Sequence, residues 1–117
     1  MATISPVETS IRGATSGLGI ITWETLTESD TAASYSPNGL QSYAGSIQVV
    51  GTFGGATVVL QGSNDNTNWV DLSDPNGTAI SFTAAGAAEF ATAMAYIRPS
   101  ASGGTSQDLD IIVSTRF

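Results

Sequence analysis

The chain has 117 residues with ten acidic and three basic side chains, a net charge of −7, and no His, Cys or Lys. This length fits one domain with a single core. Nucleic acid and anionic membranes are excluded as expected partners, because both are bound through basic side chains and the sequence has only Arg12, Arg98 and Arg116. Without Cys, no disulfide or thiolate metal site can form.

The scarcity of charge is itself informative. Charged residues make up 11% of the chain, against about 25% in typical soluble domains. Thirty Ser and Thr residues and thirteen Gly residues stand in their place. A surface with so few charges is easily buried against neighbouring proteins, which indicates an oligomer or a component of an assembly.

Residues 1–17 are rich in Ser and Thr and are predicted to form an extended arm or a short strand, Thr3 to Ile11. They carry neither the basic start nor the apolar stretch of a signal peptide. Residues 18–117 are predicted to form a β-sandwich domain. No apolar run in the sequence approaches the ~20 residues of a membrane helix.

From Leu18 the pattern predicts short strands separated by turns. Glu28 to Tyr43 is predicted to be a polar connection, and Gly54-Gly55 to close an antiparallel hairpin. Pro99 lies in the predicted strand Met94–Ala101, which places the end of that strand at a sheet edge or a bulge. The predicted strands are Leu18–Thr27, Ser46–Phe53, Ala56–Gln61, Asn68–Leu72, Gly77–Thr83, Met94–Ala101 and Asp108–Phe117.

Ala84 to Ala95 is ambiguous. Its alanine content favours a helix. However, Gly86 interrupts the segment, and its apolar residues follow neither the helical period of about 3.6 residues nor the strand period of about 2. We favour a loop followed by a strand over one short helix. The sequence as a whole then predicts about eight strands, and the fold class is all-β: an antiparallel, jelly-roll-like two-sheet β-sandwich.

Catalysis is not expected, and no catalytic residue is assigned. The serines have no His or Lys to act as a base. A glycosidase needs two carboxylates across a cleft, and Asp65, Asp71, Asp74 and Glu89 are the candidates. Three of these lie in or beside turns, where Asp makes local hydrogen bonds. No cofactor is expected.

The stretch Asn64 to Asn68 offers hard oxygen ligands of the kind that calcium prefers. It has no closing glutamate and no flanking helices. We favour an ordinary Asn/Asp-rich turn and predict that no metal is bound.

Trp23 and Trp69 each lie in a predicted strand. They could form a platform on which sugars stack, but the strand pattern favours a core position for both. Arg98 is either a ligand or interface residue or a surface charge paired with a nearby acid.

Two stretches resemble a known family: Val49 to Trp69 (VVGTFGGATVVLQGSNDNTNW), and Ile97-Arg-Pro99 followed by Gly103-Gly104 and the final strand. Together they are similar to small β-sandwich virion structural proteins of tailed bacteriophages. The similarity follows the chain from about Leu18 to Arg116.

The resemblance implies a capsid decoration, or cement, protein on the outer surface of the virion, made in the host cytoplasm. Its implied partners are the major capsid protein and itself, as a homotrimer. The alternative is a carbohydrate-binding or receptor-binding module of a phage tail. We expect the N-terminal arm and the edge strands to form the interfaces.

Overall fold

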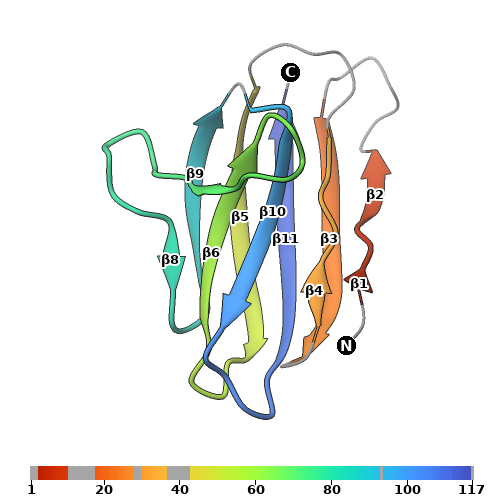
Figure 1. The fold of residues 1–117 in the computed structure, drawn as a ribbon, viewed down its shortest axis with the longest axis vertical. Helices are drawn as coiled ribbons and strands as arrows, with labels where there is room; N and C mark the ends of the chain where they lie inside the picture. The colour runs from red at the N-terminus through yellow and green to blue at the C-terminus, as the bar shows by residue number, and fades with distance from the viewer. Residues whose placement is uncertain (1–2, 11–17, 28–29, 37–42, 93, 117) are drawn as a thin grey trace.

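The computed structural model describes residues 3–10, 18–27, 30–36, 43–92 and 94–116, and every regular element in them is a β-strand. Figure 1 shows the strands packed in two layers. The predicted all-β, jelly-roll-like sandwich is therefore confirmed. The described residues contain eleven strands rather than about eight. The extra strands include β4 (Thr31–Ala32), which lies inside the predicted polar connection, and a second strand in the N-terminal segment, where β1 (Thr3–Ile4) and β2 (Val7–Ser10) replace a single predicted strand.

The larger sheet has five strands in the order β2-β3-β11-β5-β9, all paired antiparallel. The last strand of the chain, β11, lies in the middle of this sheet. The strands are β2 (Val7–Ser10), β3 (Leu18–Thr27), β5 (Tyr43–Thr52), β9 (Gly86–Thr92) and β11 (Asp108–Arg116).

The smaller sheet is built on β6 (Thr57–Ser63), which pairs with β10 (Tyr96–Ser102) along its whole length. The short strands β7 (Val70–Asp71) and β8 (Ser81–Phe82) pair with β6 as well. A separate parallel pair joins β1 (Thr3–Ile4) to β4 (Thr31–Ala32).

Residues 3–10 of the N-terminal segment form β1 and β2, and β2 is an edge strand of the larger sheet. The rest of the predicted arm, residues 1–2 and 11–17, lies outside the described residues.

The core lies between the two sheets and is made by alternate residues of their strands. Trp23 sits in it with no exposed surface, as predicted, and its indole Nε1 donates to the carbonyl of Ala33 at 2.8 Å. Other fully or nearly fully buried side chains come from both layers: Ile21, Leu26, Ile47, Val49, Val58, Leu60, Phe90, Ile97, Leu109, Ile111 and Val113.

A β-bulge in β3 places both Trp23 and Leu26 in the core, although simple alternation would put them on opposite faces. Leu26 pairs with Leu109 and Trp23 with Ile111, so β3 carries one extra residue here. Thr25 lies at the bulge and has a φ of 57°. Its N–H donates to the Asp110 carboxylate at 2.9 Å. The extra residue therefore lets the side chains on both sides of the bulge, Trp23 and Leu26, point into the core.

The predicted hairpin between residues 46–53 and 56–61 is wrong. The glycine turn is present and is closed by the Ala56 N–H donating to the Phe53 carbonyl at 2.9 Å. It carries the chain from β5 in the larger sheet to β6 in the smaller one. Both sides of β5 are already paired, with β11 and β9, so the returning strand joins the other layer.

The alanine-rich segment is a loop and then a strand, as favoured. In β9, Ala87, Glu89 and Ala91 are exposed and Phe90 is buried. This period of two is that of a strand.

Pro99 lies in β10, which is an edge strand, as predicted. On the outer side of β10, the backbone of Ile97 exchanges two hydrogen bonds with Tyr35. Residue 99 points its backbone nitrogen to that same outer side. Proline therefore removes no bond to β6.

The turn at Gly54 generates a prediction. A Cβ at Gly54 would stand 2.0 Å from the Thr105 carbonyl oxygen at a φ of +57°, whereas at Gly55 it would meet nothing within 4 Å at a φ of +89°. Both alanine variants strain the backbone, but only G54A also collides with a neighbouring loop. In urea unfolding, G55A should lose about 1 kcal/mol and G54A at least about 2 kcal/mol. Equal losses would contradict this packing.

Candidate interaction surface

The outer face of the smaller sheet carries a row of polar side chains across three strands. Arg98 on β10 pairs in register with Gln61 on β6, which pairs with Asp71 on β7. Arg98 Nε donates to Gln61 Oε1 at 3.1 Å, and Gln61 Nε2 donates to Asp71 Oδ1 at 3.1 Å. Gln61 thus joins a positive side chain at one end of the row to a negative one at the other.

Trp69 completes this surface, and its predicted core position is wrong. It is half-buried, and the guanidinium carbon of Arg98 lies 4.1 Å from its ring centroid. This is the geometry of a cation–π contact. Trp69 directly precedes β7, an edge strand of two residues. So short a strand has too few alternating residues to predict on which face of the sheet the Trp69 ring lies.

Arg98 is the one basic side chain that the structure describes, because Arg12 lies outside the described residues and the Arg116 side chain is not described. It is half-buried, and this burial lowers its pKa below the ordinary value of an arginine. The alternative of a charge paired with a nearby acid is not what the structure has: its contacts are Gln61 and Trp69. The sequence signal was the Ile97-Arg-Pro99 motif alone.

The loop from Ser63 to Asn68 is organised by Asp65. Its Oδ1 accepts from the Ser63 hydroxyl and from the backbone N–H groups of Thr67 and Asn68 at 2.8–2.9 Å. Its Oδ2 accepts from the Asn68 side-chain amide at 2.7 Å. These bonds to the ionised form hold the Asp65 pKa far below its ordinary value. The Asn64 side-chain oxygen accepts from the Ala95 N–H at 3.1 Å, which connects the loop to the residues just before β10.

The four carboxylates considered for catalysis lie in separate settings. Asp74 closes the turn before β8 by accepting from two of its backbone N–H groups at 2.9 Å. Asp71 belongs to the row with Gln61, and Asp65 to its own loop. Glu89 lies on β9 in the other sheet. Among the described residues, no three acidic side chains come together as a metal site would require.

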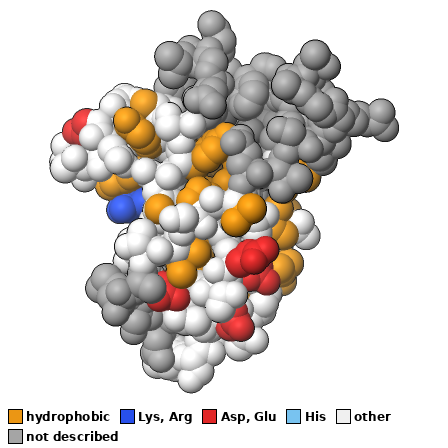
Figure 2. Space-filling view, turned by 90° about the vertical axis from the view of Figure 1, so that its right-hand side faces the viewer, with side chains coloured by type: hydrophobic (Ala, Val, Ile, Leu, Met, Phe, Trp, Pro, Cys, Tyr) orange, Lys and Arg blue, Asp and Glu red, His pale blue; other side chains and the backbone are white. Residues whose placement is uncertain are grey.

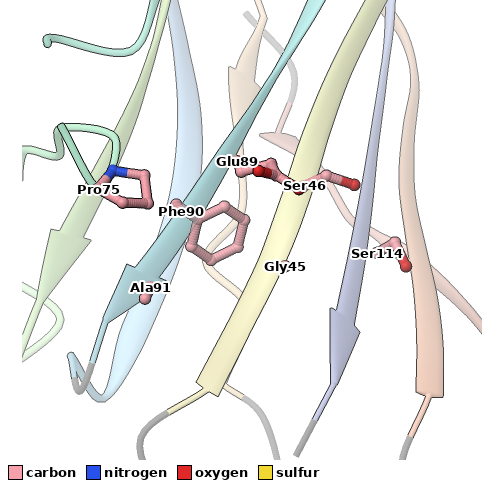
Figure 3. Close-up of a pocket in the computed structure, with 7 residues that line it drawn as sticks. All are labelled: Gly45, Ser46, Pro75, Glu89, Phe90, Ala91 and Ser114. Atoms are coloured by element: carbon pink, nitrogen blue, oxygen red, sulfur yellow. The ribbon is translucent and has the colours of Figure 1, made fainter.

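Glu89 is the acidic residue in a shallow groove of about 390 Å³. Figure 3 shows its lining, which comes from β5, β9, β11 and the loop that holds Pro75. Apart from Glu89, the lining is uncharged: Gly45, Ser46, Pro75, Phe90, Ala91 and Ser114. A single carboxylate does not supply the acid and base pair of a glycosidase.

The sheet edges form the other exposed feature. Val7 on edge strand β2 is 58% exposed, and Val70 on β7 is 52% exposed. Val70 borders a groove of about 300 Å³ beside the Asp65 loop, with Met94 on its other side. Exposed apolar side chains on strand edges are the places where another protein chain can pair or pack.

Within the described residues, the chain has no helix of the length and hydrophobicity needed to cross a membrane.

No protein-family model matches the chain, and no curated protein matches it. Among solved structures, a chain of the Bacillus endospore appendages, a family of disulfide-linked pili, aligns with a TM-score of 0.48 at 15% identity, covering 93% of this chain and 97% of that one. An RmlC-like cupin from Desulfovibrio desulfuricans aligns with a TM-score of 0.42 at 11% identity over 96% and 82% of the two chains. The CBM22-1–GH10 modules of Clostridium thermocellum xylanase 10B, complexed with xylohexaose, align with a TM-score of 0.42 at 12% identity over 96% of this chain and 24% of that one. At these identities the similarity concerns the fold alone.

The Asp65 loop generates a prediction about pH. The folded-state pKa of Asp65 lies below the ordinary value of 3.8, so the ionised carboxylate stabilises the folded protein above that pH and loses this effect as the pH falls below it. The variant D65N should unfold at lower urea than the parent at pH 7, and the gap should narrow towards pH 3. E89Q removes the same charge from an exposed position and serves as the control. A gap that is constant with pH would contradict the prediction.

The same loop generates a prediction about metal. Because both carboxylate oxygens of Asp65 already accept hydrogen bonds within the loop, it needs no cation to hold its shape. We expect the thermal midpoint to be the same with and without EDTA, and unchanged by added calcium. A large drop in midpoint with EDTA would show that the loop is a calcium site.

Proposed function

We propose that this protein is a virion structural protein of a tailed bacteriophage: a decoration, or cement, protein that binds between major capsid protein subunits on the outer surface of the head. The observation that carries the proposal is a sandwich with few charges on its surface and open strand edges. It acts by adding buried area between subunits, which requires no chemistry.

The surface favours lasting contacts with other proteins. Figure 2 shows hydrophobic side chains spread over one face, with several acidic patches and one basic side chain among them. Because charged residues make up just 11% of the chain, its surface loses little hydration of charge when it is covered. A stable protein–protein interface typically buries about 1,600 Å² in total, and faces like this one suit that purpose.

The strand edges favour assembly by strand addition. β2 and β9 bound the larger sheet, and the described part of the chain places no further strand beside either. The sequence has no lysine to discourage edge pairing. An added strand from a neighbour would satisfy the open backbone groups. Heterologous contacts of this kind form a ring when the rotation between copies closes, and a ring of three copies is the homotrimer that we propose.

The motifs that carry the family resemblance also have structural places in the fold. GTFGGA forms the crossing between the sheets, GSNDNTNW forms the Asp65 loop and ends at Trp69, and Ile97-Arg-Pro99 lies on edge strand β10. They define the turns and the outer face of a scaffold. This supports a role based on shape.

The proposal is tested with purified protein and with capsids of the phage that encodes it, prepared without the protein. We expect a trimer in light scattering, saturable binding to the capsids, and capsids that resist heat better once decorated. An electron-microscopy map should place the density where capsomers meet. A protein that stays monomeric and does not bind capsids would disprove the proposal.

A second candidate is a carbohydrate-binding or receptor-binding module of the phage tail, favoured by the half-exposed Trp69. Its neighbours Gln61 and Asp71 offer the hydrogen-bonding groups that sugars need. Trp23 has no exposed surface and cannot stack on a sugar. A glycan array with the parent protein and W69A separates the two: saturable sugar binding that W69A loses, with its melting curve intact, favours the second candidate.

A further inference from the structure

We propose that Arg98 is the anchor of the interface with the coat protein, and that it receives a carboxylate from that partner. This inference rests on the proposed function and adds to it a residue and a partner chemistry.

The guanidinium of Arg98 is held ready for a partner. Its central carbon lies 4.1 Å from the centroid of the Trp69 ring, and its Nε donates to Gln61 Oε1 at 3.1 Å. Of the five N–H donors of an arginine, the four on the terminal nitrogens have no hydrogen-bond partner in the described part of the chain. A side chain that is already ordered loses less conformational freedom when it binds.

In the described part of the chain, no carboxylate is bound to Arg98. Asp30 lines a small cavity of about 80 Å³ together with Arg98, but its carboxylate accepts from the N–H and the hydroxyl of Thr27. Asp71, the acid in the same row, is two strands away and accepts a hydrogen bond from Gln61 Nε2. Within the described residues, Arg98 forms no ion pair with a carboxylate. A half-buried cation with free donors and no carboxylate bound to it by the described residues is a site where an external carboxylate can form a bidentate, charge-assisted contact, which is strong.

The surroundings favour a protein surface as the partner. The row lies on the open outer face of a sheet, next to the half-buried Val59 and Ser100 rather than inside an enclosing cavity. Trp and Arg are the residue types that most often dominate the binding energy of protein interfaces. Here one face of the Trp69 ring is already occupied by Arg98, which reduces its value as a sugar platform.

The row also specifies the pattern of charges on the partner. Arg98 and Asp71 stand two strand spacings apart, which is roughly 10 Å. The matching surface presents a carboxylate opposite Arg98 and a cation or hydrogen-bond donor about 10 Å away opposite Asp71. Electrostatic complementarity of this kind sets the register of two proteins on each other.

The test measures binding to capsids that lack the protein, using the parent chain, R98Q, R98K and R116Q. R98Q should bind at least about tenfold more weakly. R98K should remain well below the parent, because an ammonium can neither form the bidentate contact nor stack flat on Trp69. R116Q removes the same charge from the central strand β11, away from the edge strands, and should stay within about twofold of the parent. Circular dichroism and melting curves check that each variant is folded.

The outcomes separate this inference from the proposed function. If the parent does not bind capsids, the proposed function fails and the inference falls with it. If the parent and R98Q bind equally, the inference alone is overturned. It is also overturned if R98Q breaks up self-association of the purified protein, which would make the occupant a second copy. Binding of the parent to glycans that carry carboxylates, lost in R98Q, would overturn it in favour of a sugar ligand.

Discussion

Burial of one apolar face of each sheet against the other is the constraint on which the whole structure depends. A β-strand exposes alternate residues to opposite sides, so each sheet can bury just one of its faces in a two-layer domain. Trp23 and Leu26 both reach the core because the bulge at Thr25 shifts the register between them. The row of polar side chains on the smaller sheet is left on the outside. The surface available for function follows from how the core is filled.

Several acidic side chains in this fold accept hydrogen bonds from backbone N–H groups and so stabilise turns and a bulge. Asp65 and Asp74 each organise a turn, and Asp110 holds the bulge at Thr25. In a chain with so few charges, these bonds use many of the carboxylates that the structure describes. Arg98 differs from them, because its contacts among the described residues are Gln61 and Trp69 rather than a carboxylate.

Much of the fold was predictable because strand periodicity and turn residues are local signals. The bounds predicted for β3 agree with the structure, and Trp23 lies in the core as expected. The crossing at Gly54-Gly55 was mistaken for a hairpin because a tight turn does not reveal which sheet receives the next strand. The position of Trp69 and the contact with Arg98 join residues far apart in the sequence. No local pattern contains that pairing, so the candidate surface became visible only in three dimensions.

The central place of β11 has a consequence for the order of folding. Both neighbours of this strand, β3 and β5, lie far upstream of it in the sequence, and neither pairs with the other. The larger sheet therefore cannot close during synthesis until residues 108–116 have left the ribosome. Contacts that span so much of the chain make folding slow. A chain that still lacks β11 would expose the apolar faces of β3 and β5, so incomplete copies are prone to aggregate until this strand has been made.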